Sequence, residues 1–226
     1  MAIAIQMRIA AMKANWKLPR VYPILDTGTL EARQFPVTKA AAAFLEGGAG
    51  ILQLRHKGPW TRAMFEASRE ISRLRREAGA LLVVDDRADM AMLLEAGLHI
   101  GQDDLPPRDA RRLMGAEPLI GFSSHNVAQV CAAGGEPVDY LAYGPIFPTA
   151  SKRNPDPVTG IEGLKECRAL LDKPLVAIGG ITRDTALEVL AAGADSVAVI
   201  GDLLPAELTS QSLRRRMEEW QQLLTK

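Results

Sequence analysis

Four segments of the chain share one pattern of apolar and polar positions. In each of them a stretch with helical apolar periodicity ends at a glycine, and a short, mostly apolar run follows. A glycine there suits the left-handed conformation that commonly ends a helix, and a short apolar run is typical of a buried strand. The segments are 44–54, 93–101, 131–143 and 190–200. The pattern predicts a chain built from repeated helix-then-strand units.

Extending this pattern along the chain gives eight strands, most of them continuously apolar, as expected of parallel strands covered on both faces. The expected strands are 21–25, 51–54, 81–84, 98–100, 119–122, 140–143, 175–178 and 196–200. Helical patterns fit residues 37–46, 60–77, 87–95, 107–114, 126–133, 161–171, 183–192 and 206–224. This alternation predicts a single (β/α)8 TIM barrel, with an open doubly wound sheet as the structural alternative. We expect residues 21–226 to form the barrel and residues 1–20 an N-terminal extension.

Composition narrows the class of protein. The chain has 226 residues, which suits one such barrel, and its 27 basic and 27 acidic residues cancel. A zero net charge argues against a nucleic-acid partner, which would need a basic excess or stripe. The two cysteines, Cys131 and Cys167, have neither disulfide nor metal spacing, and no apolar run could span a membrane. We expect a cytoplasmic protein that binds small-molecule substrates and does not associate with a membrane. The sequence leaves open whether the protein forms a homo-oligomer.

Polar residues follow the expected strands, at the end of the barrel where active sites of this fold lie. The cations Arg55, Lys57 and Lys152 could converge on one anion. Asp86 and Asp104, from neighbouring strands, could share Mg²⁺, which typically takes one or two carboxylates and completes its shell with phosphate oxygens and water. Together these residues predict a site for a metal-bound diphosphate.

Glycines after the last two expected strands indicate a second anion site. Gly179, Gly180 and Gly201 would let backbone N–H groups approach a phosphate closely, and phosphate sites recur at this place in barrels.

Each of these signals has a plainer explanation when it is taken alone. Asp85 or Asp86 could cap the next helix, and paired glycines are often only a turn. Their common place on one rim favours a function.

The three histidines are less decisive. His99 lies within an expected strand and could be a hydrogen-bonded core residue. His56 alternates with Arg55 and Lys57, so we expect it to point away from them. His125 follows the fifth expected strand near the mouth and is a candidate acid or base.

Seven segments together resemble the thiamine phosphate synthases, also called thiamine-phosphate pyrophosphorylases, in order and spacing. They are 22–26, 53–57, 85–91, 99–105, 121–125, 144–152 and 177–181. Members of that family join a hydroxymethylpyrimidine diphosphate to a hydroxyethylthiazole phosphate, with Mg²⁺, and release pyrophosphate. The resemblance implies a transferase in which the diphosphate leaves first and the thiazole nitrogen captures the pyrimidine-methyl cation.

The resemblance also implies roles for the rim residues. The implied catalytic residues are Arg55, Lys57, Lys152 and Ser123, with the three cations on the diphosphate. The implied substrate contacts are Gln53, Asp85, Thr149, Gly180, Ile200 and Gly201. Gln53 and Ser123 would lie beside the pyrimidine and the diphosphate, and Thr149, Gly180 and residues 200–201 around the thiazole phosphate. Asp86 and Asp104 are implied as the Mg²⁺ ligands.

Three positions depart from the family's usual pattern. Asp85 stands where asparagine is usual, and its extra carboxylate could tighten metal binding or weaken the diphosphate site. Gly201 stands where serine is usual, which removes a hydroxyl donor to the thiazole phosphate but keeps the backbone N–H. His56 stands where glutamate is common, which should be tolerated if it faces outward.

Two rival functions share this fold. A thiazole tautomerase would use a histidine such as His125, but Lys57, Lys152 and the run 101–104 favour the synthase. A catalytically inactive barrel could bind thiazole phosphate as a sensor. The intact set of Arg55, Asp86 and Asp104 argues against it, whereas the Asp85 and Gly201 departures leave it open.

Overall fold

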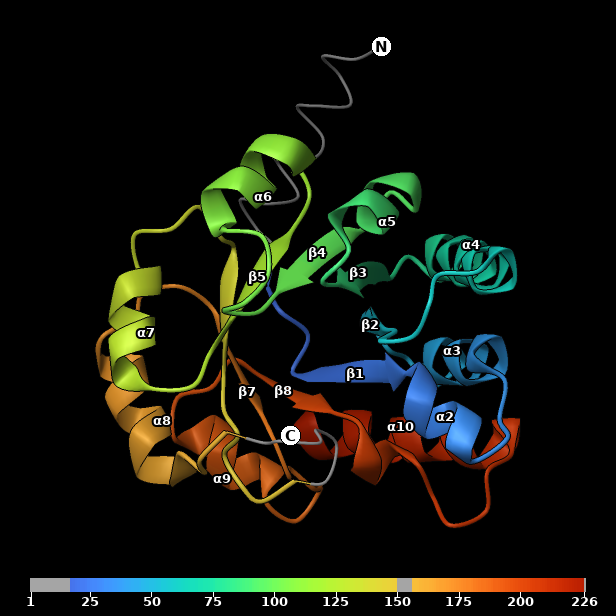
Figure 1. Ribbon diagram of the computed structural model, residues 1–226. Helices are drawn as coiled ribbons and strands as arrows, with labels where there is room; N and C mark the ends of the chain where they lie inside the picture. Colours follow the sequence, from blue (N-terminus) through green and yellow to red (C-terminus); the bar gives the residue numbers. More distant parts are fainter. Residues whose placement is uncertain (1–16, 150–155, 226) are drawn as a thin grey trace.

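The computed structural model describes residues 17–149 and 156–225, and within them eight parallel strands form a closed barrel (Figure 1). The strands are β1 (Val21–Asp26), β2 (Ile51–Arg55), β3 (Leu81–Asp85), β4 (Gly97–Ile100), β5 (Ile120–Ser124), β6 (Tyr140–Tyr143), β7 (Leu175–Ile178) and β8 (Ser196–Val199). They pair in sequence order, and β8 pairs back to β1. The predicted (β/α)8 barrel is confirmed, and the open sheet is excluded.

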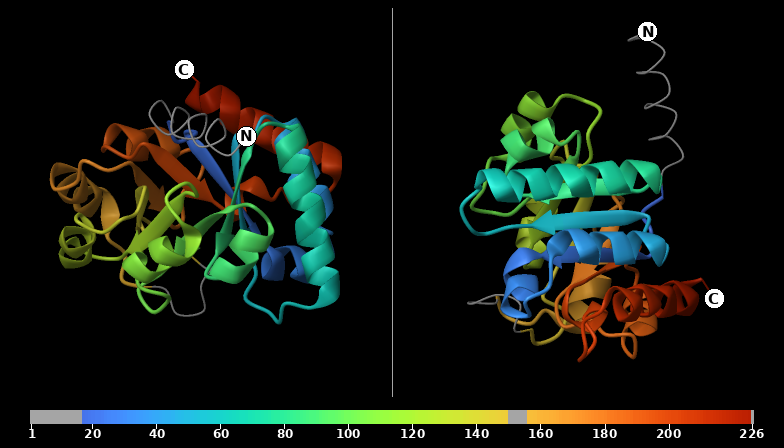
Figure 2. Two further views of the ribbon diagram at one scale, coloured as in Figure 1. Left: turned by 90° about the horizontal axis from the view of Figure 1, so that it is seen from above. Right: turned by 90° about the vertical axis from the view of Figure 1, so that its right-hand side faces the viewer.

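Helices surround the barrel on its outside (Figure 2). They are α2 (Thr27–Ala32), α3 (Val37–Glu46), α4 (Arg62–Glu77), α5 (Ala88–Leu93), α6 (Pro107–Met114), α7 (Val127–Ala133), α8 (Gly160–Ala169), α9 (Ala186–Ala191), α10 (Ser210–Leu224) and the 3₁₀ helix η1 (Gly201–Leu203). The last helix begins at Ser210 rather than at 206, because Thr209 and Ser212 form a capping box there. The helix α2 was not expected.

Several strands extend further at their carboxyl ends than their apolar runs. The pairing of β1 with β2 continues to Asp26 and Arg55, and the pairing of β5 with β6 continues through Ser123 and Ser124. Backbone pairing does not require an apolar side chain, so these polar residues complete the ladder. Asp26, Arg55, Asp85 and Ser123 therefore lie within the strands that carry them, not in the loops beyond.

The apolar core has two layers. A large cluster fills the space between the strands and the helices, and includes the stripe of Leu213, Met217, Trp220 and Leu224 on α10. A smaller cluster fills the inside of the barrel. Its members are Leu18, Tyr22, Ile24, Ile51, Val83, Tyr140, Ala142, Val176 and Ala198. The barrel is thus packed with side chains beneath its mouth, as is usual for this fold.

The barrel interior has room for the buried ring of Tyr140 only because residue 121 is a glycine. A Cβ atom on Gly121 would lie 2.1 Å from Cζ of Tyr140 and 2.5 Å from Nδ1 of His99. We expect Gly121→Ala to lower the free energy of unfolding by about 1–3 kcal/mol, the usual effect of overpacking, as measured by urea denaturation. Gly135→Ala is the control, because no heavy atom lies within 4 Å of its Cβ position. Equal midpoints for the two variants would contradict this account of the packing.

Residues 1–16 of the expected N-terminal extension lie outside the described residues. In the described part of the chain, no helix combines the length and apolarity needed to cross a membrane. Both cysteines are free: Cys131 is exposed on α7, and Cys167 is buried on α8.

Candidate active site

A cavity of about 620 Å³ opens at the carboxyl ends of the strands. It is lined by nearly all of the residues that the sequence singled out, namely Gln53, Arg55, Lys57, Asp85, Asp86, Asp104, Ser123, Thr149, Gly180, Ile200 and Gly201. Lys152 lies outside the described residues. The barrel thus brings residues from seven strands and their following loops into one cavity.

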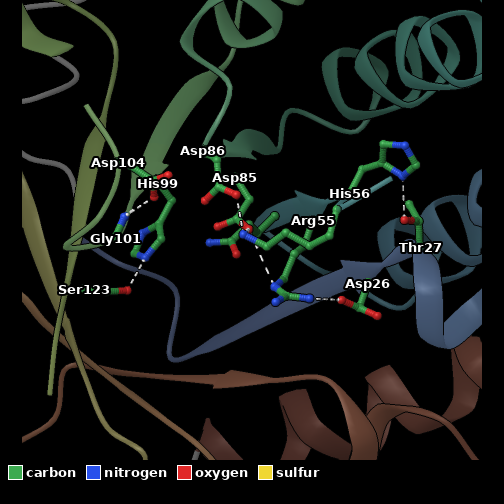
Figure 3. Close-up of polar contacts among 12 residues, drawn as sticks. Asp26, Thr27, Arg55, His56, Asp85, Asp86, His99, Gly101, Asp104 and Ser123 are labelled. Carbon is green, nitrogen blue, oxygen red and sulfur yellow. Dashed lines mark hydrogen bonds and ion pairs between the residues drawn. The ribbon is translucent and has the colours of Figure 1, made fainter. Parts of the chain in front are cut away.

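Arg55 is held in place by two carboxylates at the end of β2 (Figure 3). Its Nη1 donates to Oδ2 of Asp26 at 2.5 Å, and its Nε lies 3.6 Å from Oδ2 of Asp85. Burial opposes ionisation of Asp26, but hydrogen bonds from Thr29 and Arg55 outweigh it and lower the pKa of this carboxyl group. Asp26 is therefore a carboxylate that fixes the guanidinium with its remaining N–H groups available to an anion.

Lys57 and Asp85 form a second ion pair next to the first. The Nζ atom of Lys57 lies 2.9 Å from Oδ2 of Asp85 and also donates to Oδ2 of Asp86. Burial raises the pKa of Asp85, although Lys57 and Arg55 act in the opposite direction. Burial lowers the pKa of Lys57, but the two aspartates outweigh it and raise that pKa. The ammonium group is thus charged and is shared between two carboxylates.

Asp86 and Asp104 lie side by side from adjacent strands. Burial and the neighbouring Asp86 raise the pKa of Asp104, although the backbone N–H of Gly101 donates to its Oδ2 at 2.7 Å. Asp86 has a φ of +63°, in the left-handed region that few residues other than glycine adopt, aspartate more often than most. Neither Asp85 nor Asp86 caps the next helix, whose N-cap is Arg87 without a side-chain cap bond. Helix capping therefore does not explain Asp85 or Asp86.

The acidic pair has the donor chemistry that Mg²⁺ prefers. A cation between two neighbouring carboxylates stabilises their negative charge, and Mg²⁺ commonly takes one or two carboxylates. Across the described ranges, no group of three or more His, Cys, Asp or Glu side chains could hold a metal ion. The residues present therefore fit a cation that completes its shell with ligand oxygens and water.

A chain of hydrogen bonds runs beneath the cavity, across the inside of the barrel. His99 contacts Oγ of Ser123 through Nε2 at 2.9 Å and the hydroxyl of Tyr140 through Nδ1 at 3.0 Å. That hydroxyl lies 3.0 Å from the hydroxyl of Tyr22, which accepts from Nε2 of Gln53 at 3.3 Å. The chain thereby links Gln53 and Ser123, the two residues that the resemblance places beside the pyrimidine and the diphosphate. His99 is the hydrogen-bonded interior residue that the sequence allowed for, and it also lines the cavity.

The opposite side of the cavity is built from glycines. Gly179 and Gly180 have φ values of +103° and +63°, and a Cβ on Gly180 would lie 2.4 Å from the carbonyl oxygen of Pro148. Both positions thus require glycine. At Gly201, in contrast, a Cβ would meet no atom within 4 Å, so a serine could be accommodated there. Gly201 begins η1, and its exposed backbone is on the cavity wall.

The other two histidines have different surroundings. His56 points away from the cavity, as expected. Its Nδ1 lies 2.8 Å from Oγ1 of Thr27, and Figure 3 shows His56 and Thr27 apart from Asp85 and Asp86. His125 lines the cavity, with Nδ1 2.8 Å from the carbonyl oxygen of Gly144 and 3.5 Å from Oδ2 of Asp156. Its acid–base role stays a prediction.

Sequence reasoning missed two parts of the site. Asp26 directly follows the first expected strand, so the rule that identified the other rim residues applies to it as well. The tyrosines Tyr22 and Tyr140 gave no comparable signal, because aromatic residues in strands are usually core residues. Their hydroxyl groups become part of the site only through the register of strands far apart in the sequence.

Comparisons with known proteins agree with this geometry. A family model described as thiamine monophosphate synthase matches residues 21–203. A thiamine-phosphate synthase of Koribacter versatilis is 45% identical over 208 residues, 90% of this chain and 98% of that protein. One of Chloroflexus aurantiacus is 39% identical over 197 residues, 87% and 90% of the two chains. The solved thiamine phosphate pyrophosphorylase from Pyrococcus furiosus has a TM-score of 0.75 and 35% identity, covering 91% of this chain and 96% of its own. The family match runs from the first residue of β1 to the last of η1 and includes every strand of the barrel.

Proposed function

The chain belongs to the thiamine monophosphate synthase family, and we propose that it joins hydroxymethylpyrimidine diphosphate to hydroxyethylthiazole phosphate, giving thiamine phosphate and pyrophosphate. The observation that carries this proposal is the arrangement of charge in the cavity. Arg55, Lys57 and the Asp86–Asp104 pair occupy one side, and the glycines after β7 and β8 the other. One cavity therefore offers a place for a diphosphate and a place for a monophosphate.

We propose Asp86 and Asp104 as the residues that would hold Mg²⁺. When bound, the ion supplies positive charge that stabilises the departing pyrophosphate. The close approach of the two carboxylates, which raises the pKa of Asp104 together with burial, supports this assignment. Asp103 lines the same cavity from an exposed position and has no part in the pair.

Arg55 and Lys57 are proposed to bind the diphosphate and to stabilise the charge that grows on it as the bond to the pyrimidine methylene breaks. Donors that are already oriented stabilise such charge without reorganising. Asp26 and Asp85 orient Arg55 in this way, by contacts at 2.5 and 3.6 Å. Lys152, outside the described residues, is proposed for the same anion on the basis of the family resemblance.

Gln53 and Ser123 are proposed to bind the pyrimidine. The hydrogen-bond chain through Tyr22, Tyr140 and His99 joins their side chains. A ring bound between two fixed polar groups has little freedom to rotate, which keeps the methylene carbon facing the thiazole nitrogen. Thr149, Gly180, Ile200 and Gly201 are proposed to bind the thiazole phosphate through their backbone and hydroxyl groups.

Asp85 is expected to weaken diphosphate binding, because its carboxylate competes with the substrate for Lys57 and Arg55. We expect Asp85→Asn to lower KM for the pyrimidine diphosphate by about three- to tenfold, the range that one charge a few ångströms away gives in a partly screened site. Steady-state kinetics with the other substrate saturating would measure this change. Asp109→Asn on α6 is the control. A raised KM would mean that Asp85 assists binding, through the metal or the cations.

The proposed function is tested by incubating the purified protein with both substrates and Mg²⁺. Thiamine phosphate and pyrophosphate should form in equal amounts, and chelation of the metal should stop their formation. A parallel incubation with the thiazole carboxylate phosphate alone identifies a tautomerase by isomerisation of that compound. Tight binding of thiazole phosphate without any product would instead identify a sensor. Either result would overturn the synthase proposal.

A further inference from the structure

A carboxylate lies at the glycine-lined side of the cavity, where it would repel a phosphate. Asp202, in η1, lines the cavity together with Gly180, Thr182 and Gly201. An unpaired carboxylate within a few ångströms of a phosphate opposes its binding. The charge of Asp202 therefore has to be compensated if this side of the cavity is to hold an anion.

Arg183 provides this compensation from the loop after β7. Its Nε donates to Oδ2 of Asp202 at 3.1 Å. Asp202 lines the cavity, whereas Arg183 is outside the lining and contacts Asp202 from there. The ion pair joins the loop after β7 to the loop after β8, which are the two loops that carry the glycines. It therefore acts on both halves of the anion site.

The position of Asp202 does not depend on Arg183 alone. Nε1 of the buried Trp220 donates to the same Oδ2 atom at 3.0 Å. Nη1 of Arg216 donates to the backbone oxygen of Asp202 at 2.6 Å, and Arg183 in turn donates to Glu219. Helix α10 thus holds η1 by two contacts that would remain without Arg183. Loss of the arginine would change the charge at the site more than its shape.

We propose that Arg183 is a positioning residue that sets the affinity for the phosphate end of the second substrate, by neutralising Asp202 on the cavity wall. The assignment of a phosphate to this side rests on the proposed function. The pair joins the loops after β7 and β8, whereas Arg55 and Lys57 belong to β2 and its following loop, and Asp86 and Asp104 follow β3 and β4. It should therefore affect the thiazole phosphate and leave the pyrimidine diphosphate unaffected.

The test is a comparison of Arg183→Ala with Arg215→Ala, a matched control on the exposed face of α10. Arg183→Ala should raise KM for the thiazole phosphate roughly tenfold, by the Coulomb repulsion of the uncovered carboxylate. The KM for the pyrimidine diphosphate and kcat should be unchanged. The rise should shrink at higher ionic strength, because salt screens charge at a partly exposed site. A loss caused by a displaced loop would lower kcat and would not respond to salt.

Rescue by a second substitution separates charge from structure. Asp202→Asn removes the carboxylate and keeps an oxygen that can accept from Trp220, so Arg183→Ala/Asp202→Asn should return KM to the wild-type value. A double variant with KM still raised, or Arg183→Ala with wild-type KM, would overturn the proposal.

Direct binding keeps this result separate from the proposed function. Calorimetric titration with thiazole phosphate should show weaker binding to Arg183→Ala, and titration with the unphosphorylated thiazole alcohol should show no difference. If the wild-type protein made no thiamine phosphate, this difference in binding would still support the role of Arg183. Equal binding of thiazole phosphate to wild type and variant would refute that role even in an active synthase.

Discussion

Asp86→Asn and Asp104→Asn should each lower turnover in the presence of Mg²⁺ by about a thousandfold while the fold stays intact. A bound metal supplies several kcal/mol of transition-state stabilisation, and about 1.4 kcal/mol corresponds to a factor of ten in rate. Asparagine is the informative replacement at both positions. It tolerates the left-handed φ of +63° at Asp86, and at Asp104 its oxygen can still accept from the N–H of Gly101.

The measurement is the initial rate of pyrophosphate release as a function of Mg²⁺ concentration, with circular dichroism to verify the fold. Asp103→Asn is the matched control, because it removes one carboxylate from the same cavity next to Asp104 in the sequence. The control should retain turnover close to wild type. If Asp86→Asn and Asp104→Asn both retained it as well, the assignment of the metal ligands would be wrong.

Arg55→Ala is expected to lower kcat by about a hundred- to a thousandfold, the usual effect of removing an oriented donor from a site of developing charge. Arg55→Lys should fall between this variant and wild type, because lysine keeps the positive charge but loses the planar pair of donors. The comparison therefore separates charge from geometry. Single-turnover measurements at saturating substrate concentrations give the effect on the chemical step itself.

Removal of Arg55 also affects stability, because Asp26 and Asp85 lose the cation between them. The melting temperature of Arg55→Ala should therefore fall, and rates have to be compared well below it. Arg62→Ala, at an exposed position at the start of α4, is the control for loss of an arginine elsewhere. Wild-type kcat in Arg55→Ala at saturation would show that this side chain does not stabilise the departing diphosphate.

The order of strands and helices could be predicted from apolar periodicity alone, but the ends of the strands could not. Apolar runs mark where a strand is buried, and the backbone pairing of β1 with β2 goes on to Asp26 and Arg55. Helix α2 was missed for a related reason. It follows β1 without a break and buries only Leu30, so it carries no apolar stripe that would reveal it.

The rim of the site was predictable to the extent that position after a strand determines it. Arg55, Asp86 and Asp104 satisfied that rule and line the cavity. The chain from His99 through Tyr140 to Tyr22 does not follow from local sequence, because its members are up to 118 residues apart. Which side chains meet inside a barrel depends on the stagger of its strands, and that stagger is a property of the closed sheet.

The packed interior of the barrel determines how substrates enter the cavity and how products leave it. Because Tyr22, Tyr140, Ile51 and Val176 fill the space beneath the cavity, the barrel provides no passage through to its other end. Both substrates and both products of the proposed reaction must therefore enter and leave through the same opening of the cavity. Added pyrophosphate should accordingly hinder binding of the diphosphate substrate, because it would occupy the same site in the cavity.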